Sequence, residues 1–594
     1  MSKNQKKNIK KPDKIYSPYY DYSLFIIFSI FIILLTSFKI TGDDDVFWHL
    51  STGRYILESG TVPSVDVFGF VTSGMEWMPF EWGWDVLTYL IYEAGGYTAL
   101  SIARTIIFLL IFFLYFLIFK KFKIPNSVTF LMMTLLAFGT IDRLTPRPHI
   151  ISLLFFVIIL YIIIQYKYFD RSNKKILYFL PVIFLFWANM HMGIIAGIFL
   201  LGIWVLSEII IYLKPTSFSS KEIPALSKSE LTNLIIIFVI CICFMLINPN
   251  FFATYIYAYE HTKMKLLETI NEWRSPFDSQ FGGGFVSNIY KIFLFSGIFI
   301  LYYSAKKKDL FATLVFIGFA VYSVRAVRFT VDYNIIVSVF ISIALGFIIT
   351  NLKEGKLKNL LTVSPVPKVI ISAFLIFCII NLPNNKLYLE HLQYYRISGF
   401  GINSEFIPTH LFEFIKQNDI QNIGERPLNH FGTGGFLIWN FPGKKNFIDS
   451  RNLNDSIFNE YSNIIGKRPG FEKKLNDYNF DYAIYLAPDL VRAPQEMEQT
   501  AISYLSKSPE WSLVFWDDKS FLWLKNEEKF NNIISNYSYK YLTPYNVIYN
   551  RAKLDRAILD DKETLLKEIK RKQNEDPNSI ILNSFLQNYA NKLN

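Results

Sequence analysis

Long apolar runs, separated by short polar connections, fill most of residues 23–383 and limit what the chain can fold into. A helix needs about 20 mostly apolar residues to cross a bilayer. About eleven such spans are expected, at residues 23–40, 98–119, 127–143, 148–165, 176–190, 193–213, 231–247, 287–304, 310–324, 331–350 and 367–383. The pattern predicts a polytopic α-helical membrane protein.

The composition excludes other broad classes. Apolar residues make up 52% of the 594 residues and charged residues 18%, whereas ordinary soluble proteins carry about 25% charged residues. The net charge of +11 is spread over many connections, so no nucleic-acid partner is expected. All three cysteines lie inside apolar runs, which argues against a disulfide framework or a Cys-based zinc site.

Lysine and arginine gather in every second connection. The basic connections contain Lys120, Lys121 and Lys123; Lys167, Arg171, Lys174 and Lys175; Lys214, Lys221 and Lys228; Lys306, Lys307 and Lys308; and Lys353, Lys356, Lys358 and Lys368. The positive-inside rule places these connections and the Lys-rich N-terminus in the cytoplasm. An odd number of spans then leaves the C-terminal part outside. We expect a multi-pass protein of the cytoplasmic (inner) membrane.

The expected domain plan has four parts. Residues 1–22 form a cytoplasmic N-terminal tail, and residues 23–385 form the transmembrane domain, which includes a long outer loop at 41–97. Residues 386–526 form an extracytoplasmic α/β domain, and residues 527–594 form a short helical tail. Apolar spacing predicts two helices in the outer loop, one starting near Val46 and one after Pro79.

Charged and histidine side chains collect on the lysine-poor, outer side. Charges are expensive within a membrane, at about 2.5–3.5 kcal/mol each at mid-depth, so their gathering at one face indicates a site. The candidate substrate-binding residues are Glu81, Arg143, Arg147, His149, His191, Glu272, Arg325 and Arg328. The spans themselves carry few charges, which disfavours a transporter. As structural alternatives, Arg325 and Arg328 could anchor in headgroups.

Three consecutive acids open the outer loop and are the catalytic candidates: Asp43, Asp44 and Asp45. Asp45 is favoured because it immediately precedes the predicted helix; the alternative is that one acid caps this helix and the others are solvated. The spacing of Asp43 and Asp45 would also allow a divalent cation, Mg²⁺ or Mn²⁺. With the arginines, which pair bidentately with phosphate, these residues suit transfer from a lipid-phosphate sugar, with a carboxylate taking the acceptor's proton.

The chain resembles bacterial integral-membrane glycosyltransferase-like proteins of the GT-C superfamily. The resemblance is carried by DDDVFWHLSTGR (43–54), EWMPFEW (76–82), RPH (147–149), WANMH (187–191), INPN (247–250), NEWRSP (271–276), RAVR (325–328), GTGGFLIW (432–439) and FIDSR (447–451). These bacterial proteins are similar in plan to protein O-mannosyltransferases, aminoarabinose transferases and oligosaccharyltransferases. The superfamily implies an inverting transfer from a polyprenyl-phosphate sugar, with Asp45 as base or metal ligand and Asp43 as its partner.

The extracytoplasmic part is expected to contain a helix at 408–416 and buried strands at 436–439, 446–449, 482–486, 512–516 and 520–524, the last two forming a hairpin. No helix is expected after the glycines at 432, 434 and 435, so a turn is favoured over a phosphate-binding loop. Asp449 and Arg451 are expected either to pair structurally or to contact an acceptor glycan.

Three functions are compatible with this pattern. The first is a membrane glycosyltransferase that uses a polyprenyl-phosphate sugar donor and an extracytoplasmic glycan, lipid or protein acceptor. The second is a non-catalytic scaffold or glycan-binding subunit, and the third is a polysaccharide polymerase or ligase with lipid-diphosphate substrates. Convergence of Asp43, Asp45, Arg147, Arg325 and Arg328 in one outer cavity would favour an enzyme, whereas scatter around the rim would favour a scaffold.

Overall fold

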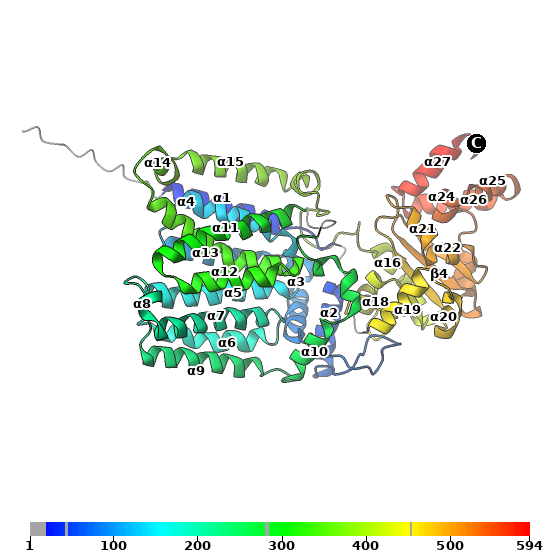
Figure 1. Cartoon of the computed structure of the whole chain (residues 1–594). Helices are drawn as coiled ribbons and strands as arrows, with labels where there is room; N and C mark the ends of the chain where they lie inside the picture. The colour runs from blue at the N-terminus through cyan, green and yellow to red at the C-terminus, as the bar shows by residue number, and fades with distance from the viewer. Residues whose placement is uncertain (1–18, 42–44, 279–283, 452–453, 594) are drawn as a thin grey trace, which may run out of the picture.

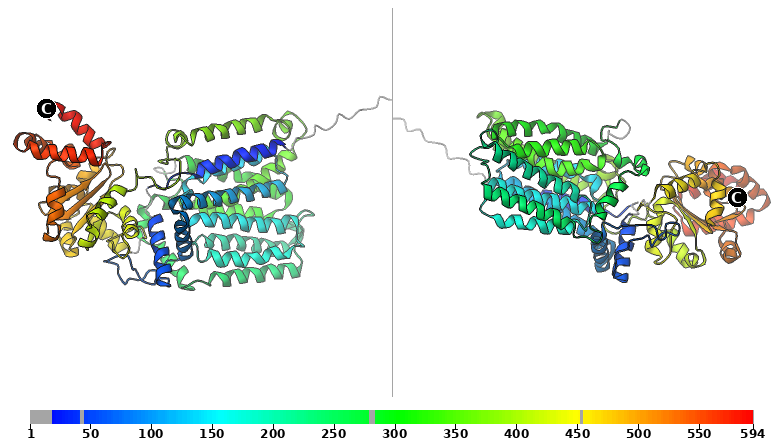
Figure 2. Two further views of the ribbon diagram at one scale, coloured as in Figure 1. Left: turned by 180° about the vertical axis from the view of Figure 1, so that it is seen from behind. Right: turned by 60° about the horizontal axis from the view of Figure 1, so that its bottom comes forward.

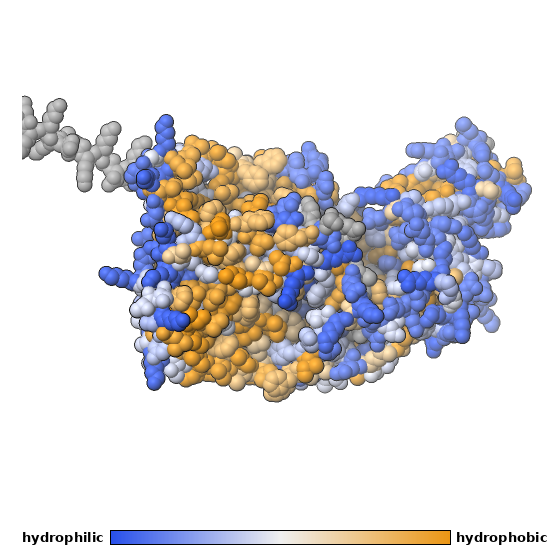
Figure 3. All heavy atoms as spheres, in the orientation of Figure 1, coloured by the Kyte–Doolittle hydropathy of each residue, from blue (hydrophilic) through white to orange (hydrophobic). Residues whose placement is uncertain are grey.

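The computed structural model describes residues 19–41, 45–278, 284–451 and 454–593. It contains a bundle of apolar helices and, at one end of the bundle, a second body built around a small sheet (Figure 1). The bundle surface is largely hydrophobic between two hydrophilic ends, and the second body is mainly hydrophilic (Figure 3). This distribution is that of a membrane protein with a water-exposed domain.

All of the predicted membrane segments are helical in the structure. The bundle helices are α1 (Tyr19–Thr36), α3 (Trp82–Lys121), α4 (Asn126–Gly139), α5 (His149–Ile164), α6 (Phe179–Trp187), α7 (Ile194–Leu213), α9 (Lys228–Met245), α11 (Phe285–Lys307), α12 (Leu310–Ser323), α13 (Thr330–Thr350) and α15 (Val366–Asn381). By length and composition, six helices of the described chain can cross a membrane, or seven if the bent pair of α14 (Lys356–Thr362) and α15 is one span. The expected count of eleven is not confirmed, because several apolar helices are shorter than a full span.

Helix α13 is the centre of the bundle. Its side chains are buried almost without interruption from Thr330 to Ala344, and it packs against α3, α4, α5, α11 and α12. Even its polar residues Asn334, Ser338 and Ser342, which lie four apart on one face, are buried, so neighbours surround the helix on all sides. Because α13 begins right after Arg328, its burial fixes the end of the chain segment that carries this arginine.

Two helices lie across the end of the bundle that faces the second body (Figures 1 and 2). They are α2 (Asp45–Ser59) and the first part of α3, which is broken at Gly95 and Gly96. Gly96 has a φ of 62° and allows the chain to turn into the bundle. The two helices predicted in the outer loop are therefore present. The short helices α8 (Pro215–Phe218) and α14, from two lysine-rich connections, lie at the opposite end (Figure 1).

The second body has a four-stranded sheet in the order β1-β2-β4-β3. Strand β1 (Pro427–Asn429) runs parallel to β2 (Tyr482–Leu486), while β4 (Ser520–Lys525) is antiparallel to both β2 and β3 (Trp511–Trp516). The predicted strands at 482–486, 512–516 and 520–524, and the hairpin between the last two, are confirmed.

This body also contains helices, several of which lie beside the sheet (Figure 1). They are α16 (Thr409–Gln417), α17 (Ile420–Ile423), α18 (Gly434–Asn440), α19 (Asp455–Ile465), α20 (Phe471–Tyr478), α21 (Gln495–Gln499), α22 (Ala501–Lys507), α23 (Asn531–Tyr537), α24 (Pro544–Tyr549), α25 (Arg551–Asp560), α26 (Lys562–Glu575) and α27 (Ile580–Leu593). The helix expected at 408–416 is confirmed as α16.

Two strand predictions in this region are wrong. Residues 436–439 lie in helix α18, and residues 446–449 form no strand beyond one bridge between Asn446 and Gly69. Helix α18 begins at Gly434 and contains Gly434 and Gly435, contrary to the expectation that no helix follows this glycine segment. Short apolar runs such as Phe436–Trp439 do not distinguish a strand from one buried turn of helix.

Candidate functional site

The end of the bundle that faces the second body carries a cavity of about 410 Å³. It is formed by the connection between α4 and α5, the connection before α11, and the start of α13. Its lining residues are Asp142, Arg143, Thr145, Arg147, Asn271, Glu272, Val327, Thr330 and Val331. Three of the predicted substrate-binding residues therefore line one cavity: Arg143, Arg147 and Glu272.

Glu272 connects two arginines from different parts of the chain. Its carboxylate lies 2.9 Å from Arg143 Nη2 and 3.8 Å from Arg328 Nη1. Arg328 also stacks on the indole of Trp273, 4.2 Å from the ring centroid. Burial alone would raise the pKa of Glu272, but Arg143, Arg328 and Arg147 together lower it. Glu272 is therefore an anion that holds guanidinium groups in place beside the cavity.

Asp45 is the first residue of α2 and pairs with the third arginine. Its Oδ2 lies 3.0 Å from Arg147 Nη1. Its Oδ1 accepts hydrogen bonds from Trp48 Nε1 (3.2 Å) and from the Ser450 hydroxyl (2.5 Å). The side chain is 19% exposed, so it is fixed in orientation but accessible from outside.

A cluster of buried acids and histidines lies behind Asp45. His49, one helical turn beyond Asp45, shares a hydrogen bond of 2.5 Å between its Nδ1 and Asp85 Oδ1. Its Nε2 lies 3.9 Å from Glu81, and His191 Nε2 lies 3.7 Å from the other oxygen of Glu81. The backbone N–H of Gly193 donates to His191 Nδ1 (3.0 Å), so the proton of a neutral His191 is on the nitrogen facing Glu81.

The pKa values of Glu81 and His191 are shifted by their surroundings. Burial, reinforced by the negative charge of Asp45, raises the pKa of Glu81 to about 8, although Arg328 and Arg147 oppose this. Burial and the nearby Arg328 and Arg143 lower the pKa of His191 to about 3. At neutral pH Glu81 is thus mostly protonated and His191 is neutral, so these two residues add little net charge beside the arginines.

The other predicted residues have simpler positions. His149 donates through Nε2 to the backbone carbonyl of Arg143 (2.8 Å), which fixes the connection carrying two of the arginines. Arg325 is exposed and is not part of the cavity lining. Asp43 and Asp44 lie outside the described residues, and their roles stay predictions.

The predicted divalent cation would take Asp43 and Asp45 as ligands. Within the described ranges, no group of three His, Cys, Asp or Glu side chains could hold a metal ion. The oxygens of Asp45 face an indole N–H, a hydroxyl and a guanidinium group, which is not the environment of a cation ligand. Asp43, the expected second ligand, is not described, and the cation stays a prediction.

Sequence reasoning missed three contributors to this region: Asp85 as the partner of His49, Ser450 as a partner of Asp45, and Asp66 as a partner of Arg451. The spacing of Asp45 and His49 and that of Glu81 and Asp85 place each pair on one helix face. That pattern could have indicated the first contact. The other two join residues 405 and 385 positions apart in the sequence, and no local pattern reports them.

The sequence matches no protein-family model and no curated protein. Solved structures with a similar fold do exist. The apo oligosaccharyltransferase of Archaeoglobus fulgidus is 12% identical with a TM-score of 0.54, covering 98% of this chain and 87% of that chain.

Two further structures are similar. The Archaeoglobus fulgidus oligosaccharyltransferase AglB in complex with an inhibitory peptide and a dolichol-phosphate is 11% identical with a TM-score of 0.50, covering 97% of this chain and 86% of that one. ArnT from Cupriavidus metallidurans, bound to undecaprenyl phosphate, is 12% identical with a TM-score of 0.47, over 86% and 99% of the two chains. The fold expected from the sequence resemblance is thus confirmed, because the chain shares the fold of an archaeal oligosaccharyltransferase.

Proposed function

We propose that this chain is a GT-C-type membrane glycosyltransferase that transfers a sugar from a polyprenyl-phosphate donor to an extracytoplasmic glycan, lipid or protein. One observation carries the proposal. Arg143, Arg147 and Glu272 line one cavity, with Asp45 paired to Arg147 and Arg328 paired to Glu272, at one end of an apolar bundle. The headgroup of a lipid phosphate whose tail lies among the membrane spans would be located at this end of the bundle.

The arginines are proposed to bind the phosphate. Guanidinium groups pair bidentately with phosphate oxygens and remain charged at any physiological pH. Arg143 and Arg147 come from one connection and Arg328 from another, so phosphate oxygens could be contacted from two sides. These contacts would also stabilise the charge that develops on the phosphate as it leaves.

Asp45 is proposed to be the base. The acceptor hydroxyl or amine attacks the anomeric carbon from the side opposite the phosphate, and Asp45 takes its proton. The bond between this carbon and the phosphate oxygen breaks, so polyprenyl phosphate leaves and the configuration inverts. Arg147 and the Ser450 hydroxyl orient the carboxylate for this step.

The fold comparison supports the carrier class. The archaeal oligosaccharyltransferase of similar fold was solved with a dolichol-phosphate and a peptide, which are a polyprenyl-phosphate carrier and a peptide ligand. The lysine-rich connections at the far end of the bundle support the proposed orientation, in which the cavity and the C-terminal domain face away from the cytoplasm in the inner membrane.

The test uses the full-length protein in lipid nanodiscs. A panel of synthetic undecaprenyl-phosphate hexoses and pentoses is supplied with a cell-envelope extract as the source of acceptors, and release of undecaprenyl phosphate is followed by mass spectrometry. Release with at least one monophosphate donor supports the proposal. Release only from lipid-diphosphate donors would instead favour a polymerase or ligase, and absence of release from any donor would favour a scaffold.

Two additions to this assay define the reaction further. Turnover that stops in EDTA and returns with Mg²⁺ or Mn²⁺ would support a cation held by Asp43 and Asp45. Turnover that EDTA leaves unchanged would contradict the prediction of a cation. Comparing surface glycans of cells with and without the gene would identify the acceptor class.

A further inference from the structure

Helix α2, which carries Asp45, is packed between the bundle and the C-terminal domain. Its residues Val46, Phe47 and Leu50 belong to one buried apolar cluster with residues of α16, α18 and the sheet. Arg54 of α2 donates to the backbone carbonyls of Ile438 and Trp439 at the end of α18 (both 3.2 Å). The proposed base therefore belongs to a helix whose position depends on the C-terminal domain.

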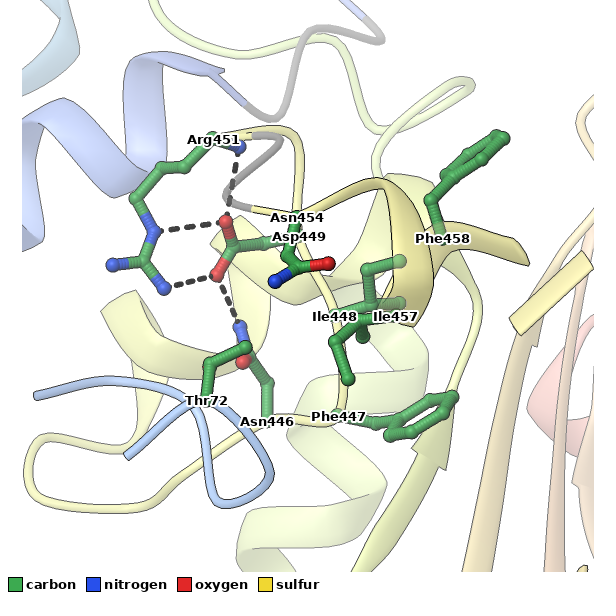
Figure 4. A pocket seen from close by; sticks show the side chains of 9 residues that line it. All are labelled: Thr72, Asn446, Phe447, Ile448, Asp449, Arg451, Asn454, Ile457 and Phe458. Carbon is green, nitrogen blue, oxygen red and sulfur yellow. Dashed lines mark hydrogen bonds and ion pairs between the residues drawn. The ribbon is translucent and has the colours of Figure 1, made fainter. Parts of the chain in front are cut away.

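A buried ionic clamp joins this domain to the outer loop. Arg451 Nη1 lies 2.7 Å from Asp66 Oδ1 in the outer loop, and Arg451 Nε and Nη2 donate to the two oxygens of Asp449 at 2.8 and 2.6 Å. All three side chains are at most 3% exposed, and the guanidinium also stacks on Trp77. Figure 4 shows the pairing of Arg451 with Asp449. Asp449 and Arg451 are thus paired structurally.

Backbone pairing and close packing fix the clamp. The N–H of Phe70 donates to the carbonyl of Asn446, and the N–H of Asn446 donates to the carbonyl of Phe68, both at 2.9 Å. The hollow beside Asp449 and Arg451 measures only about 20 Å³, room for about one water molecule. This hollow is too small for a substrate.

Ser450 lies between the two charged residues of the clamp, and its hydroxyl donates to Asp45 Oδ1. We propose that Ser450 is a positioning residue for the proposed base, delivered by the C-terminal domain and held in place by the clamp of Asp66, Asp449 and Arg451. With Arg147 on the other oxygen, the carboxylate is held from two sides. This role rests on the proposed function and extends it, since the membrane domain alone would have an incomplete site.

The chain offers a matched control for a test. Ser73 in the outer loop accepts a hydrogen bond from Lys445 of the C-terminal domain (2.7 Å). This bond joins the same two segments as the clamp, but it is exposed and does not involve Asp45. Ser450→Ala and Ser73→Ala therefore each remove one interdomain hydroxyl, and only the first removes a contact to the proposed base. Ser450→Thr keeps the hydroxyl.

Two readouts are taken on the full-length protein in nanodiscs. The first is carbodiimide labelling of Asp45, followed by peptide mass spectrometry, which requires no donor. Labelling should be several-fold faster in Ser450→Ala than in the wild type, and unchanged in Ser73→Ala. The second is turnover with the donor found above. Ser450→Ala should lower kcat by about 10- to 100-fold, the range for one hydrogen bond to a charged group, with KM unchanged.

The outcomes separate the two proposals. If Asp45 in Ser450→Ala is labelled at the wild-type rate, the positioning role is overturned. A rise in KM with kcat unchanged would overturn it as well. Equal effects of Ser450→Ala and Ser73→Ala would also overturn it, because the contact would then serve docking only. A labelling rate and a kcat close to the wild-type values in Ser450→Thr would support the positioning role. If the wild type turns over no donor, the proposed function fails, and the labelling rates still decide whether Ser450 orients Asp45.

Discussion

Glu81→Gln should stabilise the protein at alkaline pH and not at acid pH. Burial, together with the charge of Asp45, raises the pKa of Glu81 from 4.5 to about 8 in the folded chain. The folded chain then keeps a proton that the unfolded chain loses, so stability falls as the pH rises from about 4.5 to about 8. At 1.36 kcal/mol for each pH unit, the full loss is ~5 kcal/mol. Glutamine cannot ionise and avoids this loss.

The assay is thermal unfolding of the full-length protein in detergent between pH 5 and pH 9. With the unfolding entropy expected for this length, ~5 kcal/mol corresponds to ~4 °C in Tm. The variant should match the wild type near pH 5 and exceed it by about this amount above pH 8. Glu76→Gln is the matched control, because Glu76 is an exposed carboxylate of the same loop. A difference between Glu81→Gln and wild type that does not grow with pH would refute the reasoning.

Three further predictions test the site and its supports. Arg143→Ala should weaken binding of undecaprenyl phosphate, measured by native mass spectrometry, by about tenfold or more, whereas Arg325→Ala, outside the cavity, should not; equal losses would remove the cavity as the phosphate site. Asp66→Asn breaks a buried ion pair and should lower the free energy of unfolding by about 3–5 kcal/mol, seen as faster proteolysis between the two bodies; wild-type resistance would count against the clamp. Gly53→Ala would place a Cβ 2.1 Å from the carbonyl of Asp85 and should destabilise the α2–α3 contact by about 1–3 kcal/mol, whereas Gly202→Ala, with 3.7 Å of room, should leave Tm unchanged.

Much of the architecture follows from local patterns. Apolar runs locate the bundle helices, and the spacing of Val46 and of the residues after Pro79 locates the two helices that lie across its end. The positive-inside rule puts Arg143, Arg147, Glu272 and Arg328 on one side of the membrane, which is why their proximity could be anticipated.

The parts that escaped prediction depend on tertiary contacts. Helix α18 has the same apolar residues that a buried strand would have, and its packing on α2 decides its conformation. The clamp joins Asp66 to Arg451, and the Ser450 contact joins two bodies. Neither follows from spacing along the chain, because residues far apart in sequence meet only after both bodies have folded.

The most direct test of the account is transfer by Asp45→Asn, which preserves the size of the side chain but removes the carboxylate. With any donor that the wild type uses, the account predicts no release of undecaprenyl phosphate, while membrane insertion and binding of undecaprenyl phosphate persist. Release at the wild-type rate by Asp45→Asn would contradict the proposal that this carboxylate is the base.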